Sequence, residues 1–204
     1  EGFNSSMYNF NDTLDRAVLK PVAKGYKAVM PDPAQKMVHN FFSNIDDIFV
    51  TANDLLQFKF RQAASDFTRV WVNSTFGVFG LFNVADKLEK HNEDFGQTLG
   101  HWGANSGPYL VLPLLGPSTV RDGAGLAVDS NYGVIENLED ISVRNSLWAT
   151  NKVDQRVQLL DAEEIMEDTV VDRYSFIRDG YLMHRRSLVY DGDPPREKFD
   201  EEEE

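Results

Sequence analysis

Apolar residues recur every three or four positions along most of the chain, which is the spacing of one face of an α-helix. The strongest pattern spans residues 34–58, where this face continues for about six turns and Pro33 suits the first turn. The same spacing predicts helices over residues 11–30, with a kink or break at Pro21, and over residues 62–73. A largely helical protein is therefore expected.

Two further helix starts are indicated by capping residues. Residues 118–122 place hydroxyl side chains before an acid in the first turn. Asp161 is expected to cap the last helix, with Glu164 completing a capping box, and the stripe that follows is Met166, Val170, Tyr174, Ile177 and Tyr181. Strand-like alternation is nearly absent, so the predicted fold class is all-α, and 204 residues fit a single domain.

An apolar segment between residues 93 and 122 contains repeated glycines and prolines. Glycines permit sharp turns, whereas prolines remove amide donors and interrupt helices. Irregular backbone is costly to bury, so this segment fits a cavity wall or a hinge that faces a membrane. Residues 99–108 can form either a rigid turn or a moving gate, and residues 109–115 either a hairpin or an extended piece.

Charge and composition exclude several classes of function. The net charge of −13 and the absence of a basic stripe argue against nucleic-acid binding. Residues 191–204 carry eight acids against two bases, and we predict a disordered tail there, after a helical domain at residues 1–190. The chain has no cysteine and no run of about 18 apolar residues that could span a bilayer. Its 14 Phe, 7 Tyr and 3 Trp fit either a core or insertion at a membrane interface.

Sequence motifs of enzymes are missing. The nucleophile elbow, the zinc-protease motif, the P-loop and the dinucleotide-binding motif do not occur, and the four histidines are scattered. His101 near Ser106 and Asp94 would suit a lipid hydrolase, but no nucleophile or oxyanion-hole motif accompanies it. We expect His101 to bond turn carbonyls instead. The prediction is a protein that is not an enzyme, with no catalytic residue, metal or cofactor.

Two charged pairs have both a structural and a functional interpretation. Asp46 and Asp47 point about 100 degrees apart on a helix, which favours a solvated face over a joint carboxylate site. Arg121 and Asp122 fit either a buried pair that stabilises a helix start or a contact to a lipid phosphate at a channel mouth. The sequence does not decide between these two interpretations of Arg121 and Asp122.

Five motifs together resemble one known family. They are Glu1–Asn11, Asn40–Asn44, Arg69–Gly77, Glu93–Asp122 and Gln158–Asp161. In this order and spacing, from residue 1 to about residue 185, the sequence resembles the MlaA (VacJ) family of Gram-negative outer-membrane lipoproteins.

The resemblance implies a monotopic helical ring in the inner, periplasmic leaflet of the outer membrane, with a glycine-rich hairpin loop around an amphipathic pore. Such proteins remove phospholipid from the outer leaflet without catalysis, maintain lipid asymmetry, pass the lipid to the periplasmic carrier MlaC and associate with trimeric porins. Phospholipid is then cargo, not cofactor. The family also implies a lipid anchor on an upstream cysteine, so a chain that begins with Glu1 is expected to have lost it.

The resemblance also implies roles for individual residues. The lipid path and gating loop are expected at Gly100, Gly103, Gly107, Tyr109, Leu110 and Leu112. Candidate head-group contacts are Arg121 and Asp122. The membrane-facing residues are expected to include Phe41, Phe42, Phe76, Phe79, Leu81 and Phe82. Two other functions stay open: a porin-associated structural adaptor without its own lipid path, and the lipid hydrolase that would use His101.

Overall fold

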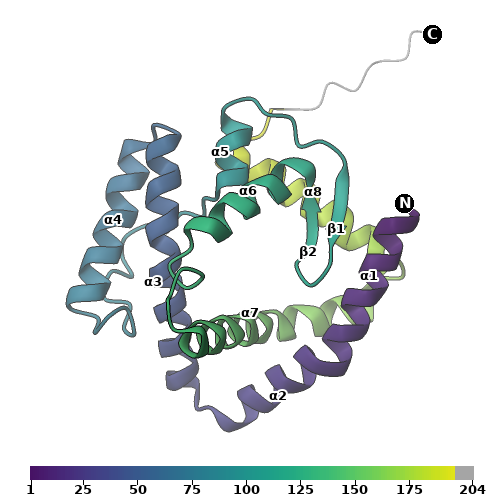
Figure 1. Ribbon diagram of the computed structural model, residues 1–204, viewed down its shortest axis with the longest axis horizontal. Helices are drawn as coiled ribbons and strands as arrows, with labels where there is room; N and C mark the ends of the chain where they lie inside the picture. The colour runs from purple at the N-terminus through teal and green to yellow at the C-terminus, as the bar shows by residue number, and fades with distance from the viewer. Residues whose placement is uncertain (196–204) are drawn as a thin grey trace.

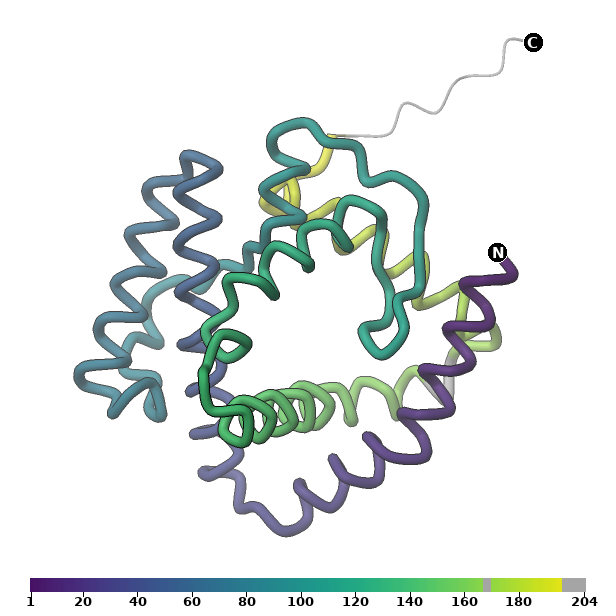
Figure 2. The backbone as a smooth tube through the Cα atoms, viewed as in Figure 1, coloured from purple at the N-terminus to yellow at the C-terminus, as the bar shows by residue number. Residues whose placement is uncertain are grey.

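The computed structural model describes residues 1–195, apart from the side chains of residues 167–169. Its helices follow one another around a ring with an open centre (Figures 1 and 2). Along the chain the elements are α1 (Gly2–Leu14), the π-helix η1 (Asp15–Leu19), α2 (Lys20–Val29), α3 (Asp32–Leu56), α4 (Phe60–Thr75), α5 (Phe95–His101), β1 (Tyr109–Leu112), β2 (Gly116–Thr119), α6 (Val120–Tyr132), α7 (Ile141–Thr169) and α8 (Arg173–Val189).

The first helical arm runs without interruption from α1 through η1 into α2. Pro21 has no amide donor, and the predicted irregularity takes the form of a π-helical turn immediately before it. The arm ends because Met30 is extended, as expected of a residue before a proline. Pro33 then lies in the first turn of α3, as predicted. The helices predicted over residues 34–58 and 62–73 are confirmed as α3 and α4, which pack against each other outside the ring.

The predicted start of the last helix at Asp161 is wrong. Asp161 lies inside α7, which begins after Asp140, whose carboxylate accepts bonds from the amides of Ser142 (2.8 Å) and Val143 (3.0 Å). The chain leaves the helix at Val170, and α8 begins after a second acidic cap. A capping-box sequence is therefore no proof of a helix start, because the same residues are tolerated inside a long helix.

The segment between α5 and α6 contains the only β-strands in residues 1–195. Strands β1 and β2 form an antiparallel hairpin in which Tyr109 pairs with Thr119 and Leu112 pairs with Gly116. The tight turn uses positive φ angles at Leu114 (66°) and Gly116 (85°). The fold is therefore mostly helical with a small hairpin, which confirms the helical character of the all-α prediction and adds two short strands to it. The hairpin alternative for residues 109–115 is confirmed, and its tip points toward the ring centre (Figure 2).

Packing inside the protein is unusually polar. One apolar cluster of Ala23, Val157 and Leu160, supported by Tyr26 and Val153, joins α2 to α7 and so closes the ring. Elsewhere among the described residues, buried polar and charged side chains outnumber buried apolar ones. Many large apolar side chains are exposed instead, and no described helix is long and apolar enough to cross a membrane.

The predicted boundary at residue 190 falls just after α8. Asp191 still contacts the body of the protein, because its carboxylate lies 2.6 Å from the Lys59 ammonium. The prediction of a disordered tail falls mainly on residues 196–204, which lie outside the described part of the chain.

Candidate functional site

An apolar cavity of about 860 Å³ lies inside the ring, bounded by α1, η1, the hairpin, α7 and α8. The apolar residues of its wall include Leu19, Val111, Leu114, Leu115, Leu159 and Phe176. Such a wall suits alkyl chains, since each buried methylene group is worth roughly 0.8 kcal/mol. Several charged side chains also line this cavity, so the space is amphipathic.

The charged side chains form a network that connects the first helical arm to α7 and α8. The Arg156 guanidinium donates two bonds to Asp15, at 2.7 and 2.8 Å, and it also contacts Glu163. Glu163 receives further cationic contacts from Lys20 and Arg173. Burial alone would raise the pKa of Glu163, but the hydrogen bonds from Arg156 and Arg173 outweigh it and hold the pKa at about 2. The network therefore stays charged and holds the arm in place near neutral pH.

Two asparagines of α1 fix the position of the hairpin. Asn4 donates to the carbonyl of Tyr109 (2.9 Å) and accepts from the amide of Val111 (3.0 Å). Asn11 donates to the carbonyl of Leu112 (2.9 Å) and accepts from the amide of Leu114 (2.8 Å). Residues seven apart lie on one face of a helix, so α1 satisfies the outer edge of β1 as a neighbouring strand would. We call these four bonds the asparagine clamp.

A second, more polar cavity of about 370 Å³ lies between α3, α6 and α7. Asp46, Asp129 and Glu136 line it. Neighbouring residues of α7 line the two cavities, Asn151 the polar cavity and Lys152 the apolar cavity.

The charged groups of the polar cavity are poorly solvated. Asp46 is exposed and lines this cavity, and desolvation by the residues around it raises its pKa to about 6. Desolvation also raises the pKa of Asp129 to about 6 and lowers that of Lys152. Sequence reasoning missed Asp129, Glu136 and Lys152, because nothing in the pattern of one helix shows which of its faces borders a cavity.

The glycines of the predicted gating loop fall into two groups. Gly103 (φ 92°) and Gly107 (φ 67°) adopt backbone angles that favour glycine. Gly100 instead lies within α5, where an added Cβ would meet the guanidinium of Arg121 at 2.8 Å. Tyr109, Leu110 and Leu112 form most of β1, and Tyr109 borders the apolar cavity.

Arg121 and Asp122 form a buried pair at the start of α6, which is the structural interpretation that the sequence left open. Asp122 is 8% exposed and accepts bonds from Arg121 (3.0 Å), Arg185 (2.9 Å) and Tyr181 (2.9 Å). Arg185 also contacts Asp94, so one guanidinium joins α5, α6 and α8. Burial alone would raise the pKa of Asp122, but Arg185 outweighs it and lowers the pKa to about 2. These contacts favour the packing interpretation of the pair, and its contact with a lipid head group stays a prediction.

Two predictions on α3 need correction. Phe42 is 3% exposed and packs edge-on against Phe41, so it is a core residue and does not face a membrane. Asp47 is fully buried, with its carboxylate 3.2 Å from Arg69 and 2.9 Å from Lys90, and is not part of a solvated face. For Asp47, α4 and the segment after it cover a surface that the sequence of α3 alone left uncovered.

The outer surface of α4 and the loop that follows it is strongly apolar. Phe76, Phe79 and Phe82 of the predicted membrane-facing set are 64%, 78% and 49% exposed, whereas Leu81 is half-buried. An apolar stripe missed by sequence reasoning continues along the surface of α4 through Phe60, Phe67 and Trp71. These three residues recur at helical spacing, but the sequence pattern alone did not show that no other part of residues 1–195 covers them.

His101 is exposed at the end of α5. Its proposed partner Asp94 is instead bound by Arg185 and caps α5 through the amide of Gln97 (2.8 Å). The geometry gives no support to a hydrolase.

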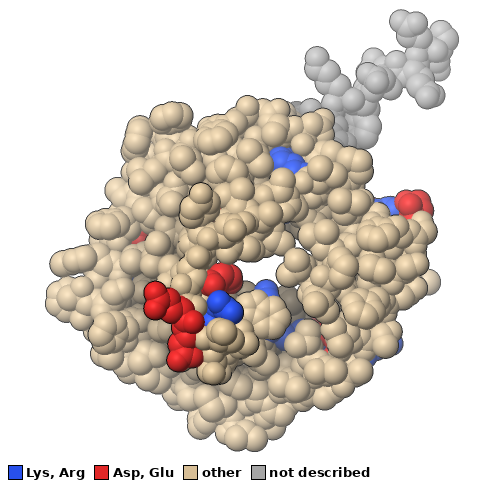
Figure 3. All heavy atoms as spheres, viewed as in Figure 1, with Lys and Arg blue, Asp and Glu red and all other residues tan. Residues whose placement is uncertain are grey.

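The ring carries few charged side chains on the face seen in Figure 3, which also leaves an opening at the centre. The densest group of charges on that face lies beside the opening, over the connection between α6 and α7. A mostly uncharged face with charge at a central opening is the arrangement that an apolar medium around a polar passage would favour.

The family model of the MlaA lipoproteins matches residues 1–188. The chain belongs to the MlaA lipoprotein family. It is 34% identical over 202 residues to the intermembrane phospholipid transport system lipoprotein MlaA of Escherichia coli K12, covering 95% of this chain and 78% of that protein. The MlaA of Haemophilus influenzae is 30% identical over 199 residues, covering 94% of this chain and 79% of the relative.

A solved structure agrees with this assignment. It is described as the structural basis for maintenance of bacterial outer membrane lipid asymmetry, and it matches with a TM-score of 0.80 at 31% identity. The match covers 92% of this chain and 96% of the other. The predicted MlaA membership is thus confirmed. Both asparagines of the asparagine clamp, Asn4 and Asn11, belong to Glu1–Asn11, the first of the five motifs on which the prediction rested.

Proposed function

We propose that this MlaA protein carries phospholipid from the outer leaflet of the Gram-negative outer membrane through its ring and toward the periplasm. The observation that supports the proposal best is the amphipathic passage. The apolar cavity offers a wall for acyl chains, and Lys152 on the wall of that cavity and Asp46 in the polar cavity offer contacts for a head group. The transfer requires no bond to be made or broken, in keeping with a family that is not enzymatic.

The hairpin is the part best placed to act as a gate. Leu114 and Leu115 at its tip line the apolar cavity, and Gly103 and Gly107 precede it with φ angles that allow large backbone changes. We infer that movement of the hairpin widens or narrows the passage. Movement of the hairpin away from α1 breaks the hydrogen bonds of the asparagine clamp, so these bonds set the free energy that opening requires.

The exposed aromatic surface of α4 and residues 76–82 supports an attachment to the inner leaflet of the outer membrane. Phe, Trp and Leu side chains at this density suit lipid or the apolar belt of a trimeric porin. We propose porins as neighbours there and the periplasmic carrier MlaC as the acceptor of the lipid.

A charge placed on the cavity wall tests the proposal. Leu159 lines the apolar cavity and is 58% exposed, so Leu159→Glu is expected to fold but to obstruct the lipid path. Val29→Glu is the matched control, because Val29 is 81% exposed outside the cavity.

The assay is complementation of cells that lack the gene, scored by outer-leaflet phospholipid and detergent resistance. We expect loss of asymmetry with Leu159→Glu and full function with Val29→Glu. If Leu159→Glu works normally while Trp71→Glu fails, a porin-associated adaptor without its own lipid path becomes the better interpretation.

A further inference from the structure

A group of buried charged residues lies between α3, α4 and the segment before α5, away from the two cavities of the ring. Asp54 of α3, Asp66 of α4 and His91 each offer one ligand atom, and these three atoms lie within 4.8 Å of one another. Both aspartates are fully buried, and the His91 side chain is 17% exposed. Three donors from three separate segments thus converge on one point.

Asp54 is the residue in this group that the protein leaves unsatisfied. Among the described residues, no donor faces either of its carboxylate oxygens, although both are buried and the carboxylate of Asp66 lies close by. Asp66 is better supplied, because its carboxylate lies 2.6 Å from Nδ1 of His91 and 3.9 Å from Nε of Arg69. Burying a carboxylate without a partner costs several kcal/mol, so such a group is rare unless a proton or a cation completes it.

Asp54 also lacks a cationic partner. Within the described residues, the ion pairs around the site join Asp47, Asp66, Glu93 and Asp191 to Lys59, Arg69 and Lys90, and Asp54 takes part in none of them. A cation at this point would supply the partner that Asp54 lacks.

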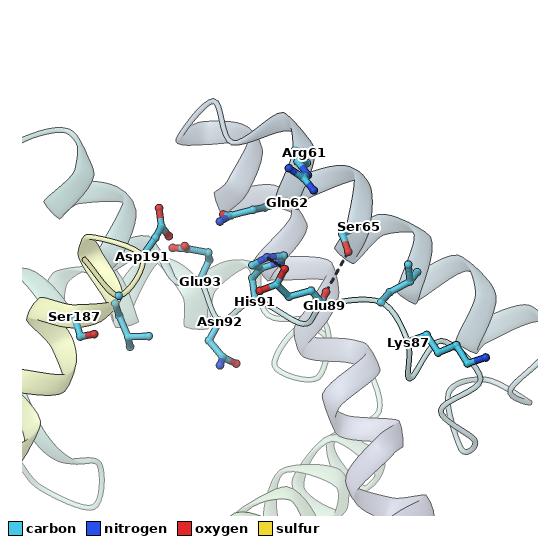
Figure 4. A pocket seen from close by; sticks show the side chains of 13 residues that line it. Arg61, Gln62, Ser65, Lys87, Glu89, His91, Asn92, Glu93, Ser187 and Asp191 are labelled. Atoms are coloured by element: carbon cyan, nitrogen blue, oxygen red, sulfur yellow. Dashed lines mark hydrogen bonds and ion pairs between the residues drawn. The ribbon is translucent and has the colours of Figure 1, made fainter. Parts of the chain in front are cut away.

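A route to this point exists. A pocket of about 640 Å³ opens beside it and is lined by Gln62, His91 and Glu93 (Figure 4). Oε1 of Gln62 has no hydrogen-bond partner, so a polar oxygen at the pocket is also available. An ion can therefore reach the donors from solvent, and water in the pocket can complete its coordination.

We propose that Asp54, Asp66 and His91 bind a divalent transition-metal ion of the zinc class, which ties α3 and α4 to the segment that leads into α5. Two carboxylates and one imidazole suit Zn²⁺, Mn²⁺ or Co²⁺ better than Ca²⁺ or Mg²⁺, which prefer oxygen ligands alone. The proposal does not depend on the lipid path, because none of the three donors lines either cavity of the ring.

The experiment uses the tag-free chain, treated with EDTA and then dialysed. Zn²⁺, Mn²⁺, Ca²⁺ and Mg²⁺ are each added alone, and binding is followed by isothermal titration calorimetry and thermal unfolding. We expect one equivalent of Zn²⁺ to bind and, at about 100 times its Kd, to raise the Tm by roughly 5–10 °C. Co²⁺ should give visible absorption bands that report its coordination.

Variants identify the ligands. Asp54→Asn keeps the shape of the side chain and should fold at least as well as the metal-free protein, yet show no shift with Zn²⁺. His91→Gln should reduce the rise in Tm that Zn²⁺ causes. Asp86 is an exposed acid on the same connecting segment, so Asp86→Asn should leave that rise unchanged. A shift that persists in Asp54→Asn would overturn the assignment. So would the absence of any shift in the unmodified chain, which would mean that Asp54 is a buried neutral acid.

Discussion

The asparagine clamp sets how easily the hairpin leaves α1, and Asn11→Ala is the change that tests it. The substitution removes two bonds, to the carbonyl of Leu112 and from the amide of Leu114. At roughly 1 kcal/mol net for each bond, the free energy of local opening falls by about 2 kcal/mol. A difference of that size raises the open population about 30-fold.

Native-state hydrogen exchange measures this opening residue by residue. In Asn11→Ala we expect the amide of Leu114 to lose protection by about 30-fold. The amide of Val111, which Asn4 holds, should lose a similar amount if the hairpin opens as one unit, and less if only the tip moves. Global stability in urea should change far less than if a core residue were lost.

Asn9→Ala is the matched control, because Asn9 has the same chemistry and is exposed on the same helix. It should leave exchange in the hairpin unchanged. Unaltered protection of Leu114 in Asn11→Ala would refute the reasoning, since the edge of β1 would then be held by something other than the side chains of α1. If the hairpin is also the gate, the same variant should increase phospholipid transfer between leaflets.

Three further outcomes are expected. Arg69→Met should destabilise the protein by about 3–5 kcal/mol in urea unfolding, because it strips buried Asp47 of a partner, whereas exposed Arg61→Met should have little effect; equal losses would contradict the buried-charge argument. The raised pKa of Asp129 means that its contribution to stability grows as pH falls from about 6 toward 4, by up to about 2 kcal/mol, and Asp129→Asn should remove that part of the pH dependence. Gly107→Pro, which cannot adopt a φ of 67° and loses an amide donor, should abolish lipid-asymmetry maintenance in cells while leaving porin association intact; normal detergent resistance would count against the gate.

Much of the helical architecture was predictable, and the exception is instructive. The apolar stripes of α3 and α4 were visible in the sequence as helical periodicity, but the face that each helix buries against the other is largely polar, with Arg69 of α4 paired with Asp47 of α3. The first part of α7 was missed, since its apolar residues are spread around the helix instead of forming one stripe. Such a helix contacts α2 on one side and borders the central space on another, so no single period describes it.

The site was predictable in location but not in detail. Glycines and prolines between residues 93 and 122 correctly indicated an irregular apolar segment, because local backbone chemistry determines where a chain turns. Asp47 and Asp122 have partners, Arg69 and Arg185, that lie 22 and 63 residues away in sequence, and no local pattern contains them. The same limit concealed Lys152, which lines the apolar cavity together with residues from distant segments.

The ring is closed by contacts between the beginning and the end of the chain. Asp15 pairs with Arg156, Lys27 with Asp161 and Asn11 with the backbone of Leu112, at separations of 141, 134 and 101 residues. Contacts this distant form late and slow the folding of a chain. The first arm therefore cannot form its ring-closing contacts until the chain as far as Asp161 is present. Loss of that arm would leave the ring open.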